Sequence, residues 1–408
     1  MADSQQLQPD ASRPGPLAGV TVLDLGQIYN GPYATFLMAM AGADVIKIEP
    51  PGGENLRRRT VVGGGALPFA MLNSNKRCLV LDLKSDSGRE ILQALVRKAD
   101  VLLENFAPGV MTRLGVGYDE LSAINPRLIY ASGSGYGLSG PYRDYPAMDL
   151  TVQAMAGVMS ITGFPDKPPV RSGPAVCDFF GGVHLCTAVS MALFERERTG
   201  KGRLVEVAMI EAVYASLSSN LGMWFGSGGK APARTGNRHG GLAESPYNVY
   251  AAKDGHIAII GVTDEHWRRL ARTVGRPDLA DDPRFATLKE RVARMDEVDA
   301  LVSSFTKDFD KQELFELLNA NRVPCAPVRD LDDVVNDVHL RERGFLNEVA
   351  HPRFGDVVLP GSPLRFQDTP LTELVPSGDP GQHSGEVLSD MLGLGPAEIA
   401  DLRQRRVI

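Results

Sequence analysis

Short apolar segments alternate with helical segments through residues 19–134, and this alternation limits the possible fold more than any other feature. The apolar segments are 19–26, 43–49, 77–83, 100–106 and 127–134. Helical patterns occupy the intervals between them, as at 31–42 and 86–99. Strands that alternate with helices of this length predict βαβ units, a parallel sheet and helices on both faces of that sheet. We therefore expect an α/β fold.

Ligands of such sheets bind beyond the carboxyl ends of the strands. Four loops therefore share one candidate edge: "GQIYNGP" (26–32), "EPPGGENLRRR" (49–59), "ENFAPGVMTR" (104–113) and "SGSGYG" (132–137). Their basic residues suit a ligand with several phosphates, and the alternative is solvated surface charge. No G-x-G-x-x-G follows the first strand and no G-x-x-x-x-G-K-[ST] is present. The sequence therefore lacks the motifs that are typical of dinucleotide-binding oxidoreductases and of P-loop enzymes.

A chain of 408 residues is too long for one ordinary core, so two domains are expected. Residues 1–17 are polar and broken by proline, which predicts a disordered tail. We assign 18–228 together with 335–408 to a large domain, and 229–334 to a smaller α+β domain. The small domain starts in the glycine-rich, basic stretch 227–247 and continues with a hairpin pattern and amphipathic helical patterns.

Composition excludes several classes of function. The net charge of −7, without any basic block, argues against nucleic-acid binding. The four cysteines lack paired spacing, which indicates reduced thiols and no metal site. We find neither a signal peptide nor a stretch of about 18 apolar residues. The expectation is a cytoplasmic protein without a membrane partner.

The segment "RSGPAVCDFFGGVHLC" (171–186) places a single acidic residue, Asp178, before an apolar helical pattern. One interpretation is a helix N-cap, which contributes about 1 kcal/mol. The other is a nucleophile. Helix N–H groups would hold the carboxylate ionised, and a partly desolvated carboxylate can attack an activated acyl group. Gly181 and Gly182 would let another group approach the helix backbone closely. The residues alone leave both interpretations open.

Several ordered segments together resemble the family III CoA-transferases, the group of formyl-CoA:oxalate and carnitine CoA-transferases. They are 16–53, 73–92, 99–115, 125–142 and 173–185. The resemblance implies a Rossmann-like large CoA-binding domain with a parallel sheet, a smaller α+β domain, and an interlocked homodimer. It also places the family nucleophile on Asp178.

The resemblance further implies where CoA binds. The implied CoA contacts are Tyr29, Asn30, Asn73, Ser74, Asn75, Lys76, Asn105, Phe106, Ala107, Arg113, Gly133, Ser134, Gly135 and Tyr136. Arg57 joins them, because Pro50 and Pro51 stand where relatives carry an arginine pair.

The segment that would form the lid over the site contains only two adjacent glycines. The candidate substrate-binding residues in this glycine-rich segment are Arg238, His239, Gly240 and Gly241, of which the arginine and histidine suit the distal carboxylate of a dicarboxylic acid. The alternative is that these four residues belong to the lid or to an interface.

The implied reaction moves CoA from an acyl-CoA donor to a free, dicarboxylic acid through aspartyl anhydride and aspartyl-CoA thioester intermediates. CoA thioesters are then substrates, with no permanently bound cofactor and no metal. An α-methylacyl-CoA racemase of the same fold is one alternative. Racemases place a histidine before an aspartate, whereas Met148 precedes Asp149 here and cannot carry a proton. A non-catalytic CoA-binding protein is the other alternative.

Overall fold

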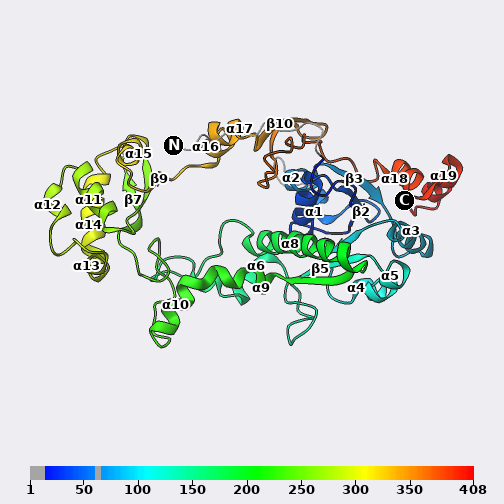
Figure 1. Ribbon diagram of the computed structural model, residues 1–408, viewed down its shortest axis with the longest axis horizontal. Coiled ribbons are helices and arrows are strands. Elements are labelled where there is room, and N and C mark those ends of the chain that lie inside the picture. The colour runs from blue at the N-terminus through cyan, green and yellow to red at the C-terminus, as the bar shows by residue number, and fades with distance from the viewer. Residues whose placement is uncertain (1–13, 60–65) are drawn as a thin grey trace. The chain divides into compact units, whose positions relative to one another are not determined.

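The computed structural model describes residues 14–59 and 66–408, which divide into two compact units (Figure 1). The first unit contains the residues up to 152 together with 175–213 and 337–408. The second contains 153–174 and 214–336. The second unit is therefore larger than the predicted small domain of 229–334.

The predicted N-terminal tail lies partly outside the described residues, which begin at residue 14. Its last residues are held against the first unit, because the Leu17 N–H donates a hydrogen bond of 2.9 Å to the Ala41 carbonyl. For residues 14–17 the predicted tail is therefore corrected.

The strands of the first unit confirm the predicted parallel sheet. They are β1 (Thr21–Asp24), β2 (Asp44–Glu49), β3 (Lys76–Val80), β4 (Val101–Glu104), β5 (Ile129–Ser134) and β6 (Arg203–Ala208). Their order in the sheet is β3-β2-β1-β4-β5-β6, and each neighbouring pair is parallel. The order reverses between β1 and β4, where the following connections diverge and open a crevice at the carboxyl ends of the strands.

Helices cover both faces of this sheet, because successive strand residues point to opposite sides. On one face, residues such as Val22 pack against α1 (Asn30–Met40) and α8 (Val176–Thr199). On the other, residues such as Leu23 pack against α3 (Asp86–Val96), α5 (Tyr118–Ile124), α18 (Ser384–Leu392) and α19 (Pro396–Gln404). The two layers are visible in Figure 1.

Shorter elements complete the first unit. They are η1 (Asn55–Arg58), α2 (Leu67–Asn73), α4 (Val110–Arg113), α17 (Val338–Glu342), and the antiparallel pair β10 (Leu346–His351) and β11 (Gly355–Pro360). Two helices cross from the first unit into the second: α6 (Asp149–Met155) and α9 (Met209–Tyr214).

The outer edge of β3 is covered by a segment from far along the chain. The Cys78 N–H donates to Nδ1 of His383 (2.9 Å), and the Val80 N–H donates to the Ser384 hydroxyl (3.2 Å). The His383 N–H in turn donates to the Cys78 carbonyl (3.0 Å). The start of α18 thus satisfies the backbone of an edge strand that would otherwise be open to pairing.

The second unit has its own sheet and core. Strands β7 (Tyr247–Ala252), β8 (Gly255–Ile260) and β9 (Cys325–Pro327) pair antiparallel, and β7–β8 is the predicted hairpin. The core around Trp267 includes residues such as Leu270, Val298 and Leu314. The helices are α7 (Val158–Ile161), η2 (Ala215–Leu217), α10 (Ser218–Gly226), α11 (Asp264–Thr273), α12 (Pro277–Ala280), α13 (Leu288–Ala293), α14 (Met295–Thr306), α15 (Lys311–Ala320) and α16 (Leu331–Val335).

Helix α8 is long and apolar enough to meet the length and composition test for a membrane span, which corrects the expectation that no such stretch exists. Half of its most apolar stretch is buried inside the protein. The core helix of a globular domain passes the same test, and the side chains of Leu185, Val189 and Leu193 pack on the sheet. The test therefore gives little support to a membrane role.

Candidate active site

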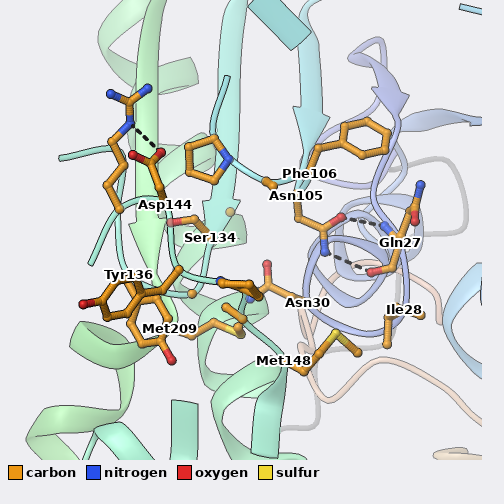
Figure 2. Close-up of a pocket in the computed structure, with 18 of the residues that line it drawn as sticks. Gln27, Ile28, Asn30, Asn105, Phe106, Ser134, Tyr136, Asp144, Met148 and Met209 are labelled. Carbon is orange, nitrogen blue, oxygen red and sulfur yellow. Dashed lines mark hydrogen bonds and ion pairs between the residues drawn. The ribbon is translucent and has the colours of Figure 1, made fainter. Parts of the chain in front are cut away.

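A pocket of about 580 Å³ lies in the first unit at the carboxyl ends of β1, β4 and β5, the edge that the sequence predicts (Figure 2). Ten of the predicted site residues line it: Asn30, Asn105, Phe106, Ala107, Arg113, Gly133, Ser134, Gly135, Tyr136 and Asp178. Loops that are distant in the sequence thus meet at the point where the strand order reverses.

Hydrogen bonds to its backbone hold the β1–α1 loop at the pocket. The Asn105 side chain bonds both backbone groups of Gln27, as Figure 2 shows, accepting from its N–H (2.7 Å) and donating to its carbonyl (2.9 Å). Ile28 has φ of 63°, a left-handed conformation that is costly for a β-branched residue. Its N–H donates to the buried Glu54 carboxyl (3.1 Å). These contacts from β4 and η1 stabilise the loop in a shape that its own sequence disfavours.

A buried charge cluster lies under the same loop. The Asp24 carboxylate accepts hydrogen bonds from the Gly26 N–H (2.8 Å), the Thr35 hydroxyl (2.7 Å) and the Lys76 ammonium (2.9 Å). The ammonium of Lys47 lies 3.8 Å from the carboxylate, and all three charged side chains are fully buried. Burial lowers the pKa of Lys76 to about 8, against the opposing effect of Asp24.

Lys76 is therefore placed differently from the sequence prediction, which made it a CoA contact. Its ammonium also donates to the Pro32 carbonyl, the Thr35 hydroxyl and the Asn73 side chain at 2.8 to 2.9 Å. With four acceptors from the protein and no exposed surface, it has no donor left for a phosphate. Lys76 instead neutralises Asp24 beneath the pocket.

The other members of that predicted group are also outside the pocket lining. Asn73 and Ser74 are buried and bond the Phe69 and Ala70 carbonyls. The Asn75 amide donates to the Glu373 carbonyl (2.8 Å) and its oxygen accepts from the Val375 N–H (3.1 Å). Each side chain is engaged by its own chain.

Arg57 and Tyr29 likewise do not line the pocket. The Arg57 guanidinium is buried, forms a bidentate pair with Glu49 (2.7 and 2.8 Å) and lies over the Phe69 ring. The Tyr29 ring stacks on Phe179, the residue after Asp178, at 6.0 Å between centroids. The exposed Arg59 reaches the Tyr29 hydroxyl at 3.5 Å. Of the three arginines at 57–59, Arg59 is the one whose charge lowers the pKa of Asp178.

Asp178 is the third residue of α8, not its N-cap, which corrects the capping interpretation. The N-cap is Ala175, which has no capping side chain. The Asp149 carboxylate takes over this function from another helix, since its Oδ1 accepts the N–H groups of Cys177 (2.9 Å) and Asp178 (3.3 Å). The side chain of Asp178 is free of a capping role.

Burial, not hydrogen bonding, dominates the electrostatics of Asp178. The residue is 7% exposed, and within the described residues its carboxyl accepts no hydrogen bond. Burial and the nearby charge of Asp149 raise its pKa to about 7, and Arg59 opposes this change. The expectation of a carboxylate held ionised by free helix N–H groups is therefore wrong, because Asp149 occupies those at Cys177 and Asp178.

The glycines of α8 serve helix packing. A side chain on Gly181 would collide with the amide nitrogen of Asn30. A side chain on Gly133 of β5 would likewise come within 2.5 Å of the Asn30 side-chain oxygen. The Asn30 amide donates to the Asp178 carbonyl (3.3 Å). The group that approaches the Gly181 backbone is thus Asn30 of α1, which helps to fix the first turn of α8.

Several residues that line the pocket are not among the predicted site residues. Arg143, Tyr145 and Met148 lie in the loop between β5 and α6, and Gln27 and Met209 also line the pocket. Tyr136, Tyr142 and Tyr145 form a cluster with ring centroids 5.2 to 6.2 Å apart. Arg143, Tyr145 and Met148 could have been predicted from their position, because their loop follows directly after the predicted "SGSGYG" segment.

The predicted substrate residues all belong to the second unit. Arg238 pairs there with Asp296 and Asp299, both at 2.6 Å, and Asp299 also accepts from Tyr250 and Asn248. Nδ1 of His239 accepts from the Gly241 and Ala243 N–H groups, and Gly240 packs against Asn220. The Arg238 guanidinium is thus already paired with two carboxylates of the protein. Its role in binding a substrate stays a prediction.

Comparisons with known proteins show what the chain is similar to. Residues 17–384 match the model of the family described as CoA-transferase family III. Acetyl-CoA:oxalate CoA-transferase of Acetobacter aceti is 43% identical over 86% of this chain and 89% of its own. Succinate–glutarate CoA-transferase of Agrobacterium fabrum is 35% identical over 93% and 96%. A CAIB/BAIF family protein from Brucella suis superposes with a TM-score of 0.82 at 33% identity, covering 93% of this chain and all of that one.

The buried charge cluster makes Lys76→Met strongly destabilising. We expect the free energy of unfolding to fall by about 3 kcal/mol, because Asp24 loses its main counter-ion without gaining solvent. Arg77→Gln is the matched control, since the neighbouring Arg77 forms partly exposed ion pairs with Asp44 and Glu386. It should cost less than about 1 kcal/mol. Urea unfolding of the full chain measures both, and equal losses would contradict the assignment.

The raised pKa of Asp178 predicts that removing its charge stabilises the protein. Because the pKa is about 7 in the folded protein and ordinarily 3.8, ionisation of Asp178 opposes folding increasingly as pH rises above about 4. Asp178→Asn should raise the free energy of unfolding by about 1–3 kcal/mol at pH 8 and hardly at pH 4. A loss of stability at pH 8, measured by urea unfolding, would show that the buried charge of Asp178 does not oppose folding.

Proposed function

The chain belongs to CoA-transferase family III and transfers CoA to carboxylic acids, and we propose that Asp178 carries the group during this transfer. The observation that supports this most is the position of Asp178 in the pocket, nearly buried and without a hydrogen-bond partner among the described residues. A carboxylate in such a place is poorly solvated and therefore a better nucleophile than one in water.

The proposed reaction starts with attack of an Asp178 oxygen on the thioester carbonyl of the donor acyl-CoA. The C–S bond breaks, CoA leaves as the thiolate, and an acyl-aspartyl anhydride remains. The thiolate then attacks the Asp178 carbonyl carbon and releases the donor acid, which leaves with the oxygen that came from Asp178. The product of this half-reaction is an aspartyl-CoA thioester.

The second half-reaction reverses these steps with the acceptor. An acceptor carboxylate oxygen attacks the aspartyl thioester, CoA leaves again, and a new anhydride forms. Attack of the thiolate on the acceptor carbonyl yields the new acyl-CoA and regenerates the Asp178 carboxylate. One acceptor oxygen stays on Asp178. The thioester bond is remade in each half-reaction, so the exchange needs no external energy source.

We assign the acceptor to the dicarboxylic acids. The relatives described above act on oxalate, succinate and glutarate by their names. Arg59 lies close enough to Asp178 to lower its pKa, and its guanidinium forms no ion pair with a carboxylate of the described residues. Its guanidinium suits a carboxylate. Acetyl-, formyl- and succinyl-CoA against a pool of these acids form the test panel.

We place the CoA portion along the loops after β4 and β5. Arg113 and Arg143 are exposed at the pocket and suit the phosphates, whereas Phe106 and Tyr136 offer rings to the apolar parts of the cofactor. Met148 also lines the pocket, and its thioether cannot exchange a proton, so no observation favours the racemase.

Oxygen labelling tests the role of Asp178. With ¹⁸O-labelled acceptor acid in unlabelled water, the peptide that contains Asp178 should gain ¹⁸O, and the donor acid released in later turnovers should carry it. The kcat/KM for acyl-CoA should rise with pH through about 7, because the ionised carboxylate attacks. Mass spectrometry of peptides and acids reads the label.

Two variants sharpen this test. Asp178→Asn should lose both transfer and labelling, whereas Arg113→Ala should raise the KM for acyl-CoA and still label Asp178. Transfer without label on Asp178 would refute the covalent route. In D₂O, deuterium at the α-carbon without any new ester would indicate racemisation, and binding without either change would indicate a CoA-binding protein.

We further propose a cytoplasmic homodimer. The outer face of α8 exposes Val183, Met191 and Phe194, the latter two at 67% and 66%. Their spacing places them on one side of the helix, which favours burial against a second subunit. Free thiols at all four cysteines support a reducing compartment. A monomer in sedimentation velocity, or activity in a secreted fraction, would contradict the respective half of this proposal.

A further inference from the structure

The first turn of α8 lacks a cap of its own, although it carries Asp178. The N-cap residue Ala175 offers no side-chain acceptor, so the first N–H groups of α8 need another partner. Asp149 at the start of α6 provides it, since Oδ1 accepts from Cys177 at 2.9 Å and from Asp178 at 3.3 Å. A residue 28 to 29 positions earlier in the chain thus closes the helix.

We infer that Asp149 is a positioning residue for the reaction, because its carboxylate caps α8 and thereby fixes the backbone from which the Asp178 carboxyl projects into the pocket. The inference rests on the proposed function in so far as Asp178 is the reacting group. The geometry itself does not depend on that function.

A second contact acts on the same turn from the opposite side. The Asn30 amide of α1 donates to the Asp178 carbonyl at 3.3 Å. The Asp178 backbone is therefore held at both polar groups, its N–H by α6 and its carbonyl by α1. Such double restraint keeps a reacting side chain in one geometry, and small displacements of a reacting group lower rates strongly.

The charge of Asp149 has a second effect. Two charged groups act on Asp178: Asp149 from α6 and Arg59 from the end of η1. The Cys177 thiol also lies beside it, and its own pKa is raised by burial and by the charges of Asp149 and Asp178. Asp149 raises the pKa of Asp178 and Arg59 lowers it. Asp149 thus both caps the first turn of α8 and shifts ionisation of the Asp178 carboxyl to higher pH. Substitutions at Asp149 can separate the capping from the charge.

The experiment compares Asp149→Ala with Asp149→Asn in the full chain. Alanine removes both the cap and the charge, whereas asparagine is a good capping residue without a charge. Hydrogen exchange of peptides that contain the Cys177 and Asp178 amides should be roughly fivefold to tenfold faster in the alanine variant. In the asparagine variant it should stay near wild type. Unchanged exchange in the alanine variant would overturn the inference.

The control is Thr151→Ala. Thr151 bonds both backbone groups of Met148 (3.0 and 2.9 Å) and stabilises the start of α6, and in the described part of the chain it forms no hydrogen bond with α8. It should leave exchange at Cys177 and Asp178 unchanged. If it speeds exchange as much as Asp149→Ala does, general loosening of α6 explains the result and the inference fails.

Kinetics give an independent reading of the same variants. Asp149→Ala should lower kcat about tenfold or more with little change in the KM for acyl-CoA. Asp149→Asn should retain most of kcat, and the pH midpoint of its kcat/KM should move down. Arg59→Gln should move that midpoint up. A fall in KM and kcat together in the alanine variant would refute the positioning role. No shift in either midpoint would refute the effect of the Asp149 and Arg59 charges on Asp178.

The outcomes also separate this inference from the proposed function. If Asp178→Asn retains transfer, the proposed function fails while the exchange data still decide the capping. If transfer depends on Asp178 but the exchange and pH midpoint ignore Asp149, only the inference fails.

Discussion

The first unit is organised around the buried carboxylate of Asp24 at the end of β1. It accepts from Gly26 in the following loop and from Thr35 in α1, and it is neutralised by Lys47 from β2 and Lys76 from β3. Removing the Asp24 carboxylate would leave the Lys76 ammonium without its counter-ion in a site without solvent, which is expensive. This cluster connects three strands and α1 directly under the loop that forms one wall of the pocket. These contacts fix this wall of the pocket to the sheet.

The Asp178 carboxyl differs from that of Asp24, because no cation among residues 14–59 and 66–408 forms an ion pair with it. Its helix is closed by Asp149 and held by Asn30, so the contacts of this turn restrain the backbone and leave the side chain unbound. Burial keeps its pKa high, near 7. A carboxyl in this state is less stable as an anion than it would be in water, and the reaction proposed above would remove that charge. Stability and reactivity are thus opposed at this residue.

The sequence was sufficient for the parts of the structure that depend on local patterns. Apolar runs such as "TVLD" at β1, and their alternation with helices, predict the parallel sheet and the edge at which the pocket lies. Contacts between distant segments were out of reach. Nothing in the sequence reveals that Asp149 meets Cys177, or that Lys76 points inward to Asp24 while Arg77 points outward. A lysine beside a predicted binding loop looks like a ligand contact until its acceptors are known.

The cover on β3 has a consequence for the way the protein is made. His383 and Ser384 satisfy the edge of a strand that lies about 300 residues earlier. On the ribosome, β3 emerges long before α18 exists, so its edge stays open to other chains during most of synthesis. The second unit, formed from 153–174 and 214–336, is complete before that edge is covered. The first unit, which contains the pocket, therefore completes the edge of its sheet only after the second unit has been synthesised.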